Sequence, residues 1–233
     1  LELVYLKGGR IKKSQSCELG PLVLDDAELS GQNKTSLIHE ELSKMDEDFP
    51  SKISQFLLVG GCWRAMARIH MNLNNYPLKV LQGYEISVKS FKETLQVIAS
   101  SDPAKLARKT STSLERLNLL PNASTVMFAL IEKFEPEKMF FSGYGIREGM
   151  LYQKFSSKIR KLEPLLDGCQ YLENQKARFP GFGKVLFDWL LPIFPRIDEQ
   201  NKILYLAGCY LHDTIWQAHP DYRSEVCFET VSG

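Results

Sequence analysis

The sequence predicts an α/β segment followed by an all-helical segment. Residues 54–59 form a short apolar run that ends at a pair of glycines, and a helical pattern of apolar residues follows. Residues 137–141 repeat this arrangement, because they too run through glycines into a helical pattern. Beyond this second helix only helical patterns continue. We therefore expect an α/β domain over residues 1–153 and a helical domain over residues 154–233.

The chain opens with a predicted β-hairpin. Residues 1–6 alternate like a strand, and residues 7–9, Lys-Gly-Gly, are a turn signal before a second strand at residues 10–18. A third short element is expected at residues 22–24, after a Gly-Pro break.

Further amphipathic helices are predicted inside the α/β domain. Residues 36–45 have helical spacing, with Ser36 as the expected N-cap. Ser87 caps a second helical pattern over residues 91–98, and a third covers residues 124–133 after a Pro-Asn pair. In the helical domain, the apolar spacing predicts helices at residues 161–175, 183–194 and 198–216.

Composition excludes several classes of function. No apolar stretch approaches the roughly 20 residues that span a bilayer, so we expect no membrane partner. The formal net charge is only +1, which gives no general attraction for nucleic acid. The cysteines, 5 in number, are widely spread and form no CxxC pair. They predict reduced thiols, a cytoplasmic location and no structural zinc.

The first glycine junction predicts an anion site. Gly60 and Gly61 carry no Cβ, so a ligand can approach the backbone, and N–H groups at the start of the next helix point toward it. In a parallel sheet both junctions lie at the carboxyl edge of their strands, where ligands bind. The alternative interpretation is a tight turn that only lets the helix pack closely.

Four stretches of the chain resemble the exopolyphosphatase and guanosine pentaphosphate phosphatase family. Their order and spacing span most of the chain, and they are residues 59–68, 75–86, 141–149 and 211–223. The resemblance implies an RNase H-like α/β lobe of the actin-like ATPase superfamily, followed by an HD-like helical domain. It further implies that this chain holds the second of two family lobes and the start of the helical domain.

The resemblance implies an activity as well. Family chemistry is the magnesium-assisted attack of water on a terminal phosphoryl group of polyphosphate or pppGpp. Because the first lobe would be missing, we expect these residues alone to be inactive, and their uncovered inter-lobe face to favour a homodimer. The alternative function is a non-catalytic module that binds polyphosphate or (p)ppGpp.

The predicted site residues follow from the same resemblance. Glu2 matches the acidic residue after the family's phosphate loop and is the catalytic candidate; the equal alternative is a solvent-facing side chain on the first strand. The substrate-binding candidates come from both junctions, and they are Gly60, Gly61, Arg64, Gly143, Gly145 and Arg147. The alternative for Arg64 is an ordinary solvated position on the helix surface.

The pair His212-Asp213 resembles the metal-binding signature of HD phosphohydrolases. Phe182, however, stands where many family members have a histidine, and an aromatic hydrocarbon ring cannot bind a metal ion. We therefore predict no metal ligands, and expect His212 to be a packed or hydrogen-bonded histidine.

Overall fold

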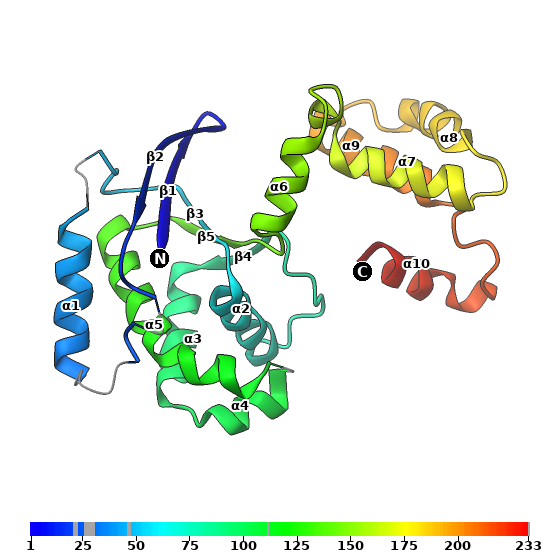
Figure 1. Ribbon diagram of the computed structural model, residues 1–233. Coiled ribbons are helices and arrows are strands. Elements are labelled where there is room, and N and C mark those ends of the chain that lie inside the picture. The colour runs from blue at the N-terminus through cyan, green and yellow to red at the C-terminus, as the bar shows by residue number, and fades with distance from the viewer. Residues whose placement is uncertain (21–22, 26–30, 46–47, 111, 233) are drawn as a thin grey trace. The chain divides into compact units, whose positions relative to one another are not determined.

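The computed structural model describes residues 1–20, 23–25, 31–45, 48–110 and 112–232 (Figure 1). The chain divides into two compact units, Leu1–Arg147 (unit 1) and Glu148–Gly233 (unit 2). Helix α6 (Ile146–Lys154) runs across this division, which lies a few residues before the expected boundary at residue 153. Each unit is described by itself.

The predicted hairpin is confirmed. Strands β1 (Glu2–Lys7) and β2 (Arg10–Ser16) pair antiparallel around the turn at residues 8 and 9. Leu3 is buried in the core of unit 1, whereas Leu6 on the opposite face is exposed. The alternation of the first strand therefore tells correctly which of its side chains enter the core.

A mixed three-stranded sheet lies at the centre of unit 1. It has the order β3-β5-β4, from β3 (Gln55–Leu58), β5 (Lys138–Phe141) and β4 (Tyr84–Ser87). The pair β3 and β5 is parallel and the pair β5 and β4 is antiparallel. The α/β class is thus confirmed. The short segment that forms β4 was not predicted as a strand, because its 4 residues alternate too briefly to be recognised.

Helices cover one side of this sheet. Figure 1 shows α2, α3 and α5 on the same side, where Met66, Phe91 and Phe141 are fully buried. On the open side Leu57 is 54% exposed. The helices of unit 1 have the bounds α1 (Gly31–Ser43), α2 (Gly61–Leu73), α3 (Val88–Ser100), α4 (Pro103–Thr110) and α5 (Leu114–Phe134).

Two helix starts differ from the sequence predictions. Helix α1 begins at Gly31, so Ser36 lies inside it and is not the N-cap. Helix α5 begins at Leu114 and contains Pro121 in its interior. Burial of Leu117 and Leu120 before the proline outweighs the local cost of one missing N–H donor. By contrast, the predicted cap is confirmed at Ser87, whose hydroxyl accepts a hydrogen bond from the Ser90 N–H at 3.2 Å.

The predicted element at residues 22–24 lies partly outside the described residues. Its described part is a turn, in which the Leu24 N–H donates to the Gly20 carbonyl at 3.2 Å. Leu24 is nevertheless fully buried in the core of unit 1. The described part of this element thus packs into the core as a turn.

A buried histidine joins three elements of unit 1. His70 on α2 places Nδ1 2.7 Å from the Tyr84 hydroxyl and Nε2 2.8 Å from the Ser90 hydroxyl. Burial lowers the pKa of His70, and the more distant carboxylate of Glu93 opposes this shift only in part. The neutral imidazole therefore ties α2 to β4 and α3.

We expect unit 1 to lose stability as the pH falls below about 6.5. The pKa of folded His70 lies below its ordinary value of 6.5, so the unfolded chain binds the proton more tightly and protonation favours unfolding. Urea unfolding between pH 5 and 7.5 measures this. His70→Gln removes the two ring hydrogen bonds, which costs about 1–2 kcal/mol at pH 7.5, and it flattens the pH dependence. An unchanged pH dependence in His70→Gln would contradict the assignment.

The described residues of unit 2 are helical and contain no strand, as predicted. Its main helices are α7 (Pro164–Lys176), α8 (Phe182–Leu190), α9 (Glu199–Leu211) and α10 (Arg223–Ser232). Asp198 caps α9 by accepting a hydrogen bond from the Asn201 N–H at 2.9 Å. Across the described residues of both units, no helix combines the length and the apolar character needed to cross a membrane.

Candidate functional site

The first glycine junction connects β3 to α2. Gly60 precedes the helix with φ 137° and ψ 168°, a backbone conformation that side chains with a Cβ rarely adopt. A Cβ on Gly60 would also lie 3.5 Å from the Trp63 ring. That distance is an ordinary van der Waals contact, so it is the backbone angle that requires glycine at this position.

The second junction connects β5 to α6 through residues 142–145. The Gly143 N–H donates to the Gln82 Oε1 at 2.9 Å, and the Tyr144 N–H donates to the Ser142 Oγ at 3.1 Å. Gln82 precedes β4, so two segments far apart in the sequence meet here. These hydrogen bonds hold the loop in one conformation before α6 begins.

Arg64 joins the two junctions. It lies in the first turn of α2, and its Nη1 donates to the Gly143 carbonyl at 2.9 Å. Because β3 and β5 are parallel, both junctions leave the same edge of the sheet, as the sequence predicted. The structure thus brings together Gly60, Gly61, Arg64 and Gly143, with Gly145 in the same loop.

These contacts alter the roles expected of two candidates. Both the N–H and the carbonyl of Gly143 are used within the protein, by Gln82 and Arg64 respectively. Arg64 is half-buried and uses one of its five N–H donors in that bond. It is therefore a positioned side chain and not a freely solvated one.

Two predicted site residues stand apart from this arrangement. The Glu2 carboxylate accepts a hydrogen bond from the Ser16 hydroxyl at 2.5 Å, across the hairpin. Within the described residues that is its hydrogen-bond partner, and it belongs to neither junction. Arg147 is exposed in the first turn of α6.

Arg116 also lies at the first junction, although its sequence position did not predict it as a site residue. A Cβ built on Gly61 would lie 3.4 Å from the Arg116 Nε and 3.5 Å from its Cζ, so this guanidinium rests against the first junction. Its positive charge also lowers the pKa of Cys62, although burial raises that pKa by more. The prediction began the α5 helix at residue 124, which left Arg116 outside any element and without a position.

In unit 2, the aspartate of the His-Asp pair binds an arginine of the same unit. The Asp213 carboxylate accepts hydrogen bonds from the Arg178 N–H at 2.9 Å, from Nε at 3.0 Å and from Nη2 at 2.6 Å. These bonds lower the pKa of Asp213, and they raise the pKa of Arg178. The cation that Asp213 holds is thus a guanidinium of the same chain.

His212 is hydrogen-bonded, as predicted. Its Nδ1 lies 2.7 Å from the Cys209 carbonyl, and its ring centre lies 5.5 Å from that of Phe182. Within the described residues, no group of three His, Cys, Asp or Glu side chains is placed to hold a metal ion. Phe182 therefore lies beside His212 and contributes no ligand.

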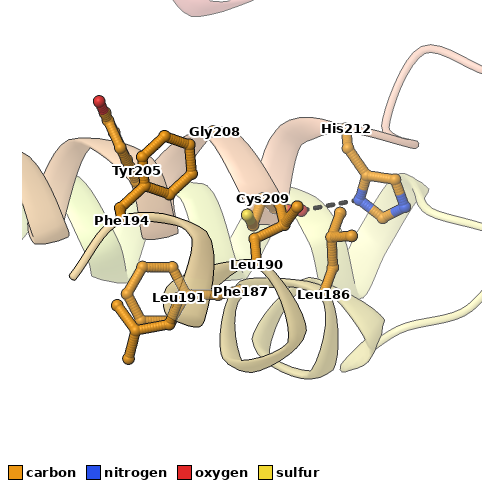
Figure 2. A pocket seen from close by; sticks show the side chains of 9 residues that line it. All are labelled: Leu186, Phe187, Leu190, Leu191, Phe194, Tyr205, Gly208, Cys209 and His212. Carbon is orange, nitrogen blue, oxygen red and sulfur yellow. Dashed lines mark hydrogen bonds between the residues drawn. The ribbon is translucent and has the colours of Figure 1, made fainter.

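An apolar pocket of about 390 Å³ lies between α8 and α9, with His212 at one end and Phe194 and Tyr205 at the other (Figure 2). Leucine side chains of α8 line its length, among them Leu186 and Leu190. This lining contains no acidic side chain, no lysine and no arginine. It does not suit a phosphate chain, so the candidate site for phosphate is the pair of glycine junctions.

The geometry defines an α/β protein that gathers backbone N–H groups and guanidinium groups at the carboxyl edge of two parallel strands. Residues 1–158 match the Ppx/GppA phosphatase family. This match covers well over half of the chain, so the chain belongs to that family. A search of curated proteins finds no matching sequence.

Solved structures show a similar fold. A crystal structure of the Ppx/GppA phosphatase from Aquifex aeolicus, a type II variant, has a TM-score of 0.55 and 17% identity, covering 66% of this chain and 53% of its own. A second structure of the Aquifex aeolicus family member has a TM-score of 0.54 and 17% identity, covering 66% and 54%. The matched region thus spans about half the length of these relatives.

Proposed function

We propose that this chain is part of a phosphohydrolase that removes terminal phosphate from inorganic polyphosphate or pppGpp. The observation that carries the proposal is the hydrogen bond from Arg64 to the Gly143 carbonyl. This bond places two glycine junctions and a guanidinium at one sheet edge. Such a collection of donors suits a phosphate chain, and membership of the Ppx/GppA family supports the same substrate class.

The finer fold assignment belongs to the same proposal. Unit 1 corresponds to an RNase H-like lobe of the actin-like ATPase superfamily, and unit 2 to the beginning of an HD-like domain. The two junctions support the first part. The pair His212-Asp213, with Phe182 beside it, supports the second. A cytoplasmic location and a homodimer complete the proposal.

Each junction residue has a part in substrate binding. Gly60 and Gly61 let a phosphate oxygen approach the backbone at the start of α2, and Arg64 supplies charge beside them. Gly143 positions Arg64 through its carbonyl. Gly145 and Arg147 extend the site toward α6, and Glu2 is the acidic candidate for orienting water.

The proposed reaction uses Mg²⁺ that is bound to the substrate. The groups left for a ligand are guanidinium groups and the backbone at the start of α2, which bind anions, and among the described residues no metal-binding cluster of three side chains exists. These residues therefore do not fit a protein-held magnesium site. We propose that Mg²⁺ is held by the phosphate oxygens that it neutralises, as it commonly is in phosphoryl-transfer enzymes.

We further propose that the 233-residue chain binds its substrate without hydrolysing it. The matched part of the chain spans about half of the related structures, and Glu2 is not joined to the junctions by a hydrogen bond. Water activation would then depend on groups that the described residues do not bring to this edge.

Calorimetry and a phosphate-release assay test both proposals with the same preparation. We expect saturable binding of a defined-length polyphosphate and of pppGpp, with no phosphate released in the presence of Mg²⁺. Arg64→Gln should weaken binding roughly tenfold or more, the loss typical of a hydrogen bond between charged groups. Arg68→Gln, one turn later on the exposed side of α2, is the matched control and should bind normally.

Two results would overturn these proposals separately. Absence of binding to either ligand by the folded chain would remove the assigned substrate class. Magnesium-dependent release of phosphate by the purified chain would leave the substrate class intact and reject the non-hydrolytic role. Comparison of the two ligands also shows which one the site prefers.

A further inference from the structure

Arg116 reaches the first glycine junction from a distant part of the sequence. It lies in the first turn of α5, whereas Gly61 begins α2, and the two helices pack against each other in unit 1. Its Nε, Cζ and Nη2 would lie 3.4, 3.5 and 3.6 Å from a Cβ on Gly61. The whole edge of the guanidinium therefore rests over the glycine.

This guanidinium is not used elsewhere in the protein. Within the described residues, Arg116 makes no hydrogen bond and no ion pair, although ion pairs are common at the surface of both units. Its neighbours at the junction are Gly61 and the thiol of Cys62, which offer no carboxylate. Arg116 is exposed, so its guanidinium is accessible to an anion that approaches Gly61 from solvent.

Arg116 and Arg64 differ in their hydrogen bonds. Arg64 donates to the Gly143 carbonyl and so belongs partly to the scaffold between the junctions. The N–H groups of the Arg116 guanidinium have no acceptor among the described residues. A planar guanidinium can donate to two oxygens of one phosphate group at once. Arg64 therefore has a structural contact between the junctions that Arg116 does not share.

We propose that Arg116 is a substrate-binding residue that binds a phosphate group of polyphosphate or of pppGpp beside Gly61. This assignment rests on the proposed function, because it deepens the same site. It adds a contact from α5, an element that none of the predicted site residues belongs to.

The experiment compares Arg116→Gln, Arg116→Lys and the control Arg68→Gln by calorimetry, using defined-length polyphosphate and pppGpp as separate ligands. We expect Arg116→Gln to weaken binding about tenfold or more and to reduce the dependence of affinity on salt concentration. Arg116→Lys keeps the charge but loses the fork, so it should restore the salt dependence and only part of the affinity. Arg68→Gln should match the unaltered chain.

A purely structural role for Arg116 makes different predictions. It would lower the thermal stability of the chain and leave both the affinity and the salt dependence of the folded protein unchanged, which would overturn the proposal. A loss confined to one ligand assigns Arg116 to that ligand, and equal losses assign it to the shared phosphate chemistry. If the unaltered chain binds neither ligand, the proposed function fails; if it binds and Arg116→Gln binds equally well, only this inference fails.

Discussion

Gly183→Ala is expected to destabilise unit 2 by about 3 kcal/mol or more, at the upper end of the costs of overpacking. A Cβ on Gly183 would lie 2.7 Å from the Cys209 carbonyl oxygen and 2.8 Å from the Tyr210 Cα. Both are backbone atoms of α9, so no side-chain rotation relieves the clash. The Gly183 N–H also donates to the buried Glu173 carboxylate at 2.6 Å, and a shift of α8 would stretch this bond.

Hydrogen exchange of peptides from α7, α8 and α9 measures the effect within unit 2. Gly208→Ala is the matched control, because it makes the same chemical change in α9 with no atom within 4 Å of the new Cβ. Helix propensity makes this control more stable by roughly 0.5–1 kcal/mol. Equal protection in the two variants would show that α8 and α9 do not approach each other this closely.

Arg178→Met is expected to lower the stability of unit 2. The side chain of Asp213 is only 8% exposed, and removal of the guanidinium leaves a buried carboxylate with one backbone N–H from residue 178. Arg178 also lies over the Trp216 ring at 5.6 Å. Methionine keeps part of that apolar contact, so the loss reports mainly on the charge.

The pH dependence of this loss has a definite sign. The pKa of Asp213 lies below its ordinary value of 3.8, so the ion pair contributes its full stability above about pH 3.8 and loses it as the pH falls through the folded value. Urea unfolding at pH 7 and at pH 3 therefore should show a smaller difference between the variant and the unaltered chain at pH 3. Arg196→Met, an exposed substitution in the same unit, is the control. A difference that stays constant with pH would reject the ion pair as its cause.

The ion pair also occupies the carboxylate of the His-Asp pair in unit 2. A divalent cation would compete with three hydrogen bonds from Arg178, and its third ligand would have to come from the position of Phe182. The sequence indicated, through its family resemblance alone, that Phe182 replaces a histidine. It did not identify Arg178 as the group that satisfies Asp213, since a bidentate contact across 35 residues leaves no local pattern.

For the candidate site, sequence patterns located the segments but not all of the contacts. Apolar runs followed by glycines identified both junctions and their common sheet edge. Gln82 and Arg116 escaped notice because each acts through a turn or helix whose local pattern says nothing about what it faces. Proline at 121 concealed the first turns of α5, and with them the position of Arg116.

The sequence by itself determined the α/β class, the family, and the glycines at the two junctions. These follow from local rules, since burial periodicity and backbone conformation depend on neighbouring residues. Only the tertiary structure decided that Arg64 bridges the junctions, that Arg116 rests on Gly61 and that Arg178 neutralises Asp213. Long side chains select their partners after the backbone has folded, and that choice depends on distances between elements that no local pattern contains.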